Sequence, residues 1–204
     1  KVYWTRTNDS YVTLANRAAF AKSVRADAFI SLHMNSATSK SANGTEVYYS
    51  VSNNKTSFSG ITSKAMANLF RKQLLADLKT TNRGTKTAAY YVLKHNTVPA
   101  ILIELGFISG NSDYSKLTNA TFQKNAANSI YKSIQTMFKP ILPVGRIGDF
   151  RTPSDELPKQ PFVFCLLPAL HNVSWLYLHH YGLILQQPDK YRPFHGINWY
   201  HMYF

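Results

Sequence analysis

Strand-like and helix-like segments alternate along the first two thirds of the chain. Short apolar runs rich in β-branched and aromatic residues predict strands, and apolar residues that recur every three or four positions predict helices. The predicted strands cover about residues 1–6, 28–32, 45–51, 90–93 and 100–103. The predicted helices cover about residues 11–24, 61–78 and 122–138. This alternation favours an α/β protein with an open sheet.

Two details of the predicted helices bear on their limits. In the last helix, apolar residues recur every fourth position from Phe122 to Phe138, which is the clearest periodicity in the chain. At the start of the first helix, Asp9 or Ser10 is expected to act as the N-cap, because a short side-chain oxygen can accept a hydrogen bond from a free backbone N–H.

The chain changes in character after residue 139. Residues 141–204 hold seven of the nine prolines, five of the seven histidines and Cys165, and no helix or strand period is sustained there. We therefore predict a domain over residues 1–139, followed by a linker and an unassigned tail over residues 140–204. The longest clean apolar run of the tail, Phe162 to Leu167, is much shorter than the roughly 20 residues of a membrane-spanning helix. No transmembrane segment is predicted.

Positive charge is concentrated in the predicted domain. The formal net charge of the chain is +13, of which residues 1–140 contribute +12, from 18 Lys/Arg and 6 Asp/Glu. Such an excess favours a polyanionic partner, which can be nucleic acid, an anionic cell wall or a membrane surface. A surface that uses lysine for solvation alone is the other interpretation. The charge does not choose among these alternatives.

Two polar residues stand where apolar strands end, and they are the candidate site residues. His33 follows the strand-like run of residues 28–32, and Glu104 follows the run of residues 100–103. Ligands of open α/β sheets gather outside the carboxyl ends of the strands, so these two side chains can converge. A neutral imidazole binds zinc, and a carboxylate beside a metal can accept a proton from bound water. A hydrogen-bonded histidine and a structural salt bridge are the alternative reading of the same positions.

Other metal and nucleophile motifs are absent from the sequence. Neither HExxH nor CxxC occurs, and the single cysteine excludes a disulfide framework. His95 precedes Pro99 in a loop-like stretch and is expected at the surface. The histidines of the tail have spacings that match no metal site; they are His171, His179, His180, His195 and His201.

Several motifs, taken in order, resemble one known enzyme family. They are ADAFISLHMNS at residues 26–36, GTEVYY at residues 44–49, the Asn-Arg-Gly of residues 82–84, and VPAILIELGFIS at residues 98–109. The terminal helix then closes the similarity near residue 139. Together they resemble the zinc-dependent N-acetylmuramoyl-L-alanine amidases of type 3, a family of bacterial and phage enzymes that lyse cell walls.

The resemblance implies a fold and a chemistry. The family has a twisted, mostly parallel sheet flanked by helices and hydrolyses the amide between N-acetylmuramic acid and L-alanine. It implies zinc as cofactor, His33 as one zinc ligand and Glu104 as the general base acting on zinc-bound water. It also implies peptidoglycan and the anionic wall as partners and an extracellular, wall-associated location. Nucleic-acid binding is not expected, because the sequence shows no basic helix and no aromatic platform with interleaved arginines.

The chain also departs from the family pattern. The family's first strand, with its Gly-His-Gly ligand motif, and its first helix, with a glutamate ligand, have no counterpart before Lys1. We therefore expect an N-terminally truncated domain that lacks two of three zinc ligands. The sequence alone leaves two functions open: a peptidoglycan amidase, inactive or active as this chain, and a catalytically silent wall-binding module.

Overall fold

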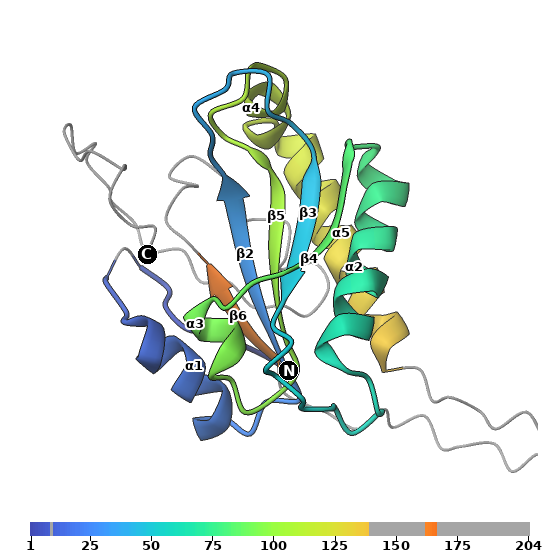
Figure 1. Cartoon of the computed structure of the whole chain (residues 1–204). Coiled ribbons are helices and arrows are strands. Elements are labelled where there is room, and N and C mark those ends of the chain that lie inside the picture. Colours follow the sequence, from blue (N-terminus) through green and yellow to red (C-terminus); the bar gives the residue numbers. More distant parts are fainter. Residues whose placement is uncertain (9, 139–161, 167–204) are drawn as a thin grey trace, which may run out of the picture.

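A computed structural model of the chain describes residues 1–8, 10–138 and, for the backbone, 162–166. Its centre is a six-stranded sheet with helices on both faces (Figure 1). The strands are β1 (Val2–Trp4), β2 (Ala28–Asn35), β3 (Thr45–Tyr49), β4 (Asn82–Thr87), β5 (Ala100–Phe107) and β6 (Phe162–Leu166). The helices are α1 (Leu14–Ser23), α2 (Ser63–Leu78), α3 (Tyr91–Lys94), α4 (Asn111–Leu117) and α5 (Ala120–Met137).

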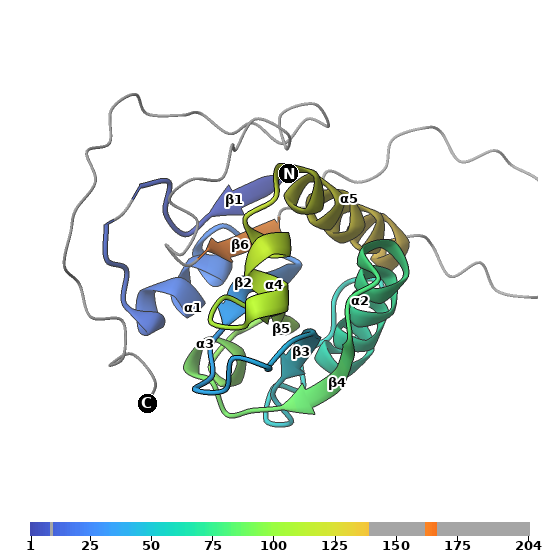
Figure 2. The ribbon, with the colours of Figure 1, turned by 90° about the horizontal axis from the view of Figure 1, so that it is seen from above.

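The strands are arranged in the order β1-β6-β2-β5-β3-β4. Every neighbouring pair is parallel except β3 and β5, which are antiparallel. The predicted open, mostly parallel α/β sheet is therefore confirmed. Viewed from above, α2 and α5 lie on one face of the sheet and α1 and α3 on the other (Figure 2).

Alternate residues of the central strands feed two separate cores. Ile30 of β2 belongs to the core cluster that packs against Phe70 of α2 and Ile134 of α5. Its neighbour Phe29 belongs to the other cluster, with Leu93 of α3. Because successive side chains of a strand point to opposite faces, a strand covered on both sides is apolar throughout. This pattern explains why residues 28–32 and 100–103 could be predicted as strands.

Residues 90–93 were predicted as a strand, and the structure shows that prediction to be wrong. Val92 and Leu93 are both buried and lie in the short helix α3, so adjacent side chains face the same core instead of alternating. The strand of this region is β4, whose single partner among the described strands is β3, at the edge of the sheet. Its sequence, NRGTKT, is polar because an edge strand needs no apolar pattern.

Two smaller predictions are also corrected. The N-cap of α1 is Thr13, whose hydroxyl accepts a hydrogen bond from the Asn16 N–H, and neither Asp9 nor Ser10 takes that place. The helix α4 was not predicted, because its seven residues are too few to show a period. The helices α2 and α5 were predicted to within a few residues of their ends.

One segment of the tail joins the sheet. β6 lies between β1 and β2 and is parallel to both, with Phe164 opposite Trp4 on one side and Ile30 on the other. The sequence showed no strand period there. The predicted domain boundary at 139/140 and the five tail histidines lie outside the described residues, and the boundary stays a prediction. None of the helices that the structure describes is long and apolar enough to cross a bilayer.

Candidate active site

His33, Glu104 and Glu46 lie side by side on three adjacent strands. His33 of β2 is in register with Glu104 of β5, and Glu104 is in register with Glu46 of β3. Leu102, two residues before Glu104, packs in the core cluster against α1 and α3, so Glu104 projects toward the same face. The structure thus brings together the two residues that the sequence singled out. They lie in the carboxyl-terminal halves of β2 and β5. The carboxyl end of β2 points to the top of Figure 1.

Glu104 is a buried carboxyl group without a full set of partners. The residue is 5% exposed, and its Oε2 atom has no hydrogen-bond partner among the described residues. Burial and, to a smaller extent, the nearby charge of Glu46 raise the pKa of Glu104 to about 8. A carboxylate with so high a pKa is a strong base once it is ionised, which suits a group that accepts a proton from water.

His33 is held as a neutral imidazole. Its Nε2 atom lies 2.6 Å from the hydroxyl oxygen of Ser31, which projects from the same face of β2. Burial, with a smaller contribution from the positive charge of Arg17, lowers the pKa of His33 to about 3. The ring is therefore uncharged at neutral pH, and the neutral imidazole is the form that binds a metal ion.

Glu46 is the centre of a polar cluster that sequence reasoning did not select as part of the site. The residue is 2% exposed. Its Oε1 atom accepts hydrogen bonds from Asn35 Nδ2 at 2.6 Å and the Tyr48 hydroxyl at 2.8 Å. Its Oε2 atom accepts bonds from Arg83 Nε at 2.9 Å and Lys86 Nζ at 2.5 Å. Burial alone would raise the pKa of Glu46, but the hydrogen bonds from Lys86, Tyr48 and Arg83 together lower it. Glu46 therefore stays ionised beside Glu104.

A sequence signal for Glu46 did exist. A carboxylate stands inside a β-rich run, directly before the buried Val47, where an unpaired charge would be costly. Its cationic partners come from β4, the strand that the sequence analysis did not find. Without β4 the pairing could not be predicted.

The described residues do not form a complete zinc site. No group of three or more His, Cys, Asp or Glu side chains in that part of the chain could hold a metal ion. Both oxygens of Glu46 are already engaged, which leaves one imidazole and the unpartnered Glu104 oxygen. A catalytic zinc is normally held by three protein ligands. The donor set of these residues therefore falls short of what zinc requires.

Comparison with known proteins decides the family. Residues 1–136 match the family model described as N-acetylmuramoyl-L-alanine amidase. The chain belongs to this amidase family. The resemblance drawn from the motifs around His33 and Glu104 is thereby confirmed.

Relatives of this amidase chain include two proteins of Bacillus subtilis (strain 168). The N-acetylmuramoyl-L-alanine amidase LytC is 38% identical over 135 residues, and the uncharacterized protein YqiI is 36% identical over 134 residues. Each match covers 66% of this chain. The match covers 26% of LytC and 62% of YqiI, so this chain spans less than two thirds of either relative.

Solved structures of amidases share the fold of this chain. The catalytic domain of CwlV, an N-acetylmuramoyl-L-alanine amidase from Bacillus (Paenibacillus) polymyxa var. colistinus, aligns with a TM-score of 0.60 at 32% identity. That alignment covers 67% of this chain and 71% of the CwlV chain. The N-acetylmuramoyl-L-alanine amidase of Clostridium difficile 630 aligns with a TM-score of 0.58 at 32% identity, over 64% of this chain and 68% of the other.

Proposed function

We propose that this amidase domain acts on peptidoglycan, at the amide between N-acetylmuramic acid and L-alanine. Zinc, if held with donors beyond those described, would supply the activation of the attacking water. In this proposal His33 would be one zinc ligand, and Glu104 would accept the proton of the attacking water and deliver it to the leaving amine. The observation that carries the proposal is the register of His33, Glu104 and Glu46, found in a chain of the amidase family.

The environment of Glu104 supports its role in proton transfer. The group lies in a water-poor place, next to an ionised carboxylate, and has one oxygen free to accept a hydrogen bond. Both effects raise the affinity of Glu104 for a proton, as the work of a general base requires. Arg83 and Lys86 neutralise Glu46, so the site does not accumulate two uncompensated negative charges.

The incomplete donor set limits what the described residues can do on their own. We propose that they bind zinc weakly, through His33, and that this chain is inactive unless other donors complete the site. The second candidate function is a catalytically silent module that binds the anionic wall. The shortage of metal donors and the net charge of +12 over residues 1–140 favour this alternative. In both cases we propose an extracellular, wall-associated location, with an autolysin role in wall catabolism if the site is active.

Measurements of zinc affinity test whether His33 is a zinc ligand, with His95, the other histidine that the structure describes, as the control. We expect His33→Ala to weaken zinc binding of the full chain by at least about tenfold, because it removes the neutral imidazole from the site. His95→Ala is the matched control, since His95 is exposed and stacks on Tyr91 outside the site. Zinc would be measured per mole of protein after dialysis, and by calorimetric titration.

Two results would contradict this assignment. Equal zinc binding by His33→Ala and the unchanged chain would show that His33 is not a ligand. Near-stoichiometric zinc after dialysis would show that the donor set is complete. Release of new L-alanine amino termini from purified peptidoglycan, assayed with added zinc, then distinguishes the enzyme from the silent wall-binding module.

A further inference from the structure

Acidic side chains of the described residues are mostly inside the protein. They are five in number, and Glu46, Glu104 and Asp113 are only 2%, 5% and 2% exposed. Asp27 and Asp77 are the two that reach the surface. Glu46, Asp113 and Asp77 each pair with cationic side chains. The remaining surface of the described residues is strongly cationic, because no other carboxylate except Asp27 reaches the surface to balance it.

Exposed lysines form a regular pattern on the two long helices. On α2 the exposed positions recur every fourth residue, and Lys64 and Lys72 lie eight residues apart along this line. On α5, Lys124 and Lys132 are exposed with the same spacing. Eight residues of helix correspond to about 12 Å. We call these four lysines the basic stripe.

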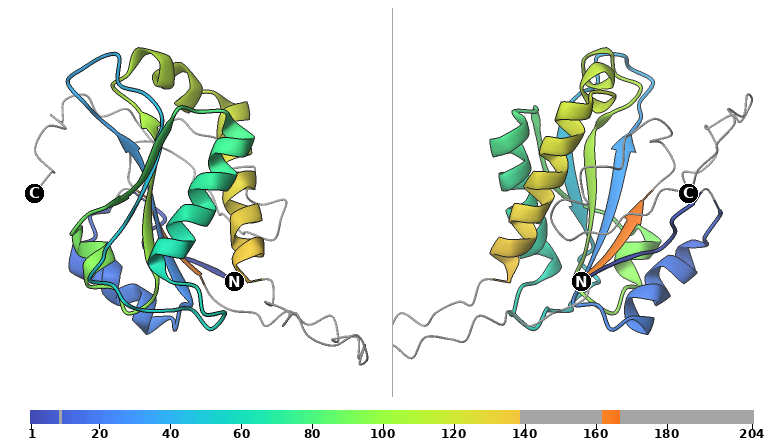
Figure 3. Two further views of the ribbon diagram at one scale, coloured as in Figure 1. Left: turned by 45° about the vertical axis from the view of Figure 1, so that its right-hand side comes forward. Right: turned by 180° about the vertical axis from the view of Figure 1, so that it is seen from behind.

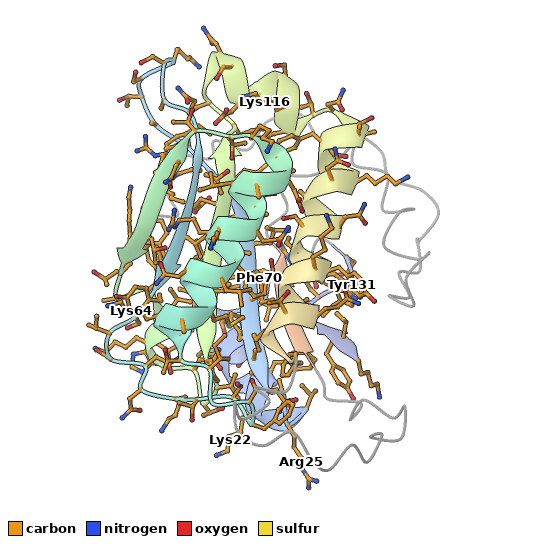
Figure 4. The ribbon with its side chains drawn as sticks, turned by 90° about the vertical axis from the view of Figure 1, so that its right-hand side faces the viewer. Lys22, Arg25, Lys64, Phe70, Lys116 and Tyr131 are labelled. Carbon is orange, nitrogen blue, oxygen red and sulfur yellow. The ribbon has the colours of Figure 1, made fainter. Side chains whose placement is uncertain are left out.

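The two helices present the basic stripe on one face of the molecule. Figure 3 shows α2 and α5 lying together on the same side of the sheet in both of its views. Figure 4 shows this side facing the viewer, with Lys64 on α2 and Tyr131 on α5. The candidate active site projects from the opposite face of the sheet, toward α1 and α3. A partner bound to the basic stripe would leave the site open.

The composition of the stripe differs from that of an ordinary helix surface. Surfaces adapted only for solvation intersperse both signs of charge. The 34 residues of α2 and α5 contain a single carboxylate, Asp77. It already accepts hydrogen bonds from Gln73 at 2.9 Å and Lys132 at 3.2 Å. Asn68 is exposed between the two lysines of α2, and exposed Asn125 and half-buried Asn128 lie between the two lysines of α5.

We propose that the basic stripe binds a phosphodiester-linked polyol polymer of the cell wall. This inference rests on the proposed action at the wall, and it names the surface and the ligand chemistry. A repeating phosphodiester matches lysines at a regular spacing, because each ammonium group attracts one phosphate as a point charge. Single-stranded nucleic acid fits less well, since its binding sites add aromatic platforms for the bases, and Tyr131, the aromatic residue among the exposed lysines of α5, is half-buried.

The test uses the full, zinc-free chain, so that it does not depend on catalysis. The probe is poly(glycerol phosphate), and binding is measured as a function of salt. In the stripe variant Lys64, Lys72, Lys124 and Lys132 are all replaced by Gln. In the matched control Lys22, Arg25, Lys40 and Lys94, which are exposed elsewhere, are replaced by Gln. Both variants lose four positive charges, so net charge alone predicts equal effects.

We expect the stripe variant to bind at least about tenfold more weakly at 0.1 M salt, and the control less than about threefold. The slope of log K against log salt should fall by about 2 for the stripe variant, at about 0.7 per lost phosphate contact, because Lys132 is already paired with Asp77. Equal weakening of the two variants would overturn the proposal. Tighter binding of the unchanged chain to single-stranded DNA than to poly(glycerol phosphate) would overturn the ligand assignment.

Two further measurements keep the result interpretable. Thermal unfolding of each variant shows whether it is folded. The double variants K64Q/K72Q and K124Q/K132Q show how much of the lost affinity for poly(glycerol phosphate) comes from α2 and how much from α5. Each double variant should lose part of the affinity, and full affinity in both would contradict the stripe. Release of L-alanine amino termini is assayed separately, with added zinc. Stripe-dependent binding supports this inference whatever that assay gives, and L-alanine release with equal binding of the stripe and control variants would support the proposed enzyme while overturning this inference.

Discussion

Glu104→Gln should stabilise the metal-free protein by about 3–5 kcal/mol at pH 8.5, by the linkage between pKa and stability. The folded-state pKa of Glu104 is about 8, against an ordinary value of 4.5. Between these two values the unfolded chain releases the proton and the folded protein keeps it. The stability that Glu104 contributes is therefore fully present below pH 4.5 and is lost as the pH rises through 8. Gln keeps the shape of the neutral group and cannot ionise.

Urea unfolding between pH 4 and pH 9 checks this expectation. The free energy of unfolding of the unchanged chain should fall across that range. For Glu104→Gln it should change much less, by the amount that the other titrating side chains contribute. Asp77→Asn is the control, because Asp77 is at the surface and has a lowered pKa. Parallel pH profiles for Glu104→Gln and the unchanged chain would show that Glu104 does not hold a proton in the folded state.

The same substitution bears on catalysis. In any preparation that releases L-alanine amino termini, Glu104→Gln should lower the rate by about 10²–10⁴, the usual contribution of a general base. Zinc binding should not depend on this residue if it is the base and not a ligand. A rate that survives the substitution would refute the proposed role of Glu104.

Glu46→Gln should destabilise the protein by about 2–3 kcal/mol at pH 6, because it leaves the cations of β4 without their carboxylate. Arg83 and Lys86 keep 36% and 39% of their side chains exposed and can be rehydrated, so the loss lies below that of a fully buried pair. The lowered pKa of Glu46 means that its contribution is present above its ordinary pKa and lost as the pH falls through the folded-state value. Urea unfolding measures the loss.

A second effect of Glu46→Gln links it to Glu104. Above pH 8 Glu104 becomes ionised, and the two carboxylates repel each other in the folded protein. We therefore expect Glu46→Gln to cost less at pH 9 than at pH 6. In the background of Glu104→Gln this difference should disappear. The same cost at both pH values would show that the two carboxylates are not coupled.

How much of the fold could be predicted depends on where each element lies. β2 and β5 are covered on both faces, so their apolar runs stand out in the sequence. α5 shows its buried face as a repeat from Phe122 to Phe138. β4, with its polar edge sequence, carries no such pattern, because what makes it a strand is its pairing with β3. Tertiary pairing of this kind leaves little trace in local sequence.

The site was predictable to the same extent. His33 and Glu104 follow apolar runs, and their common register in the sheet agrees with the rule that polar groups gather where parallel strands end. The network around Glu46 of β3 joins Asn35 of β2 to Arg83 and Lys86 of β4. These residues come from three separate strands. Such a network becomes visible only when the order of the strands is known.

The position of β6 has a consequence for how the chain acquires its structure during synthesis. β1 is made long before β6, and β6 is its only strand partner in the described sheet. A ribosome therefore releases β1 long before the strand that holds it exists, while β2, β5, β3 and β4 can already assemble. Contacts between such distant segments are slow to form, because a long loop must close first. Of the strands that the structure describes, none can pair with the β6-facing edge of β2 until residue 166 has emerged.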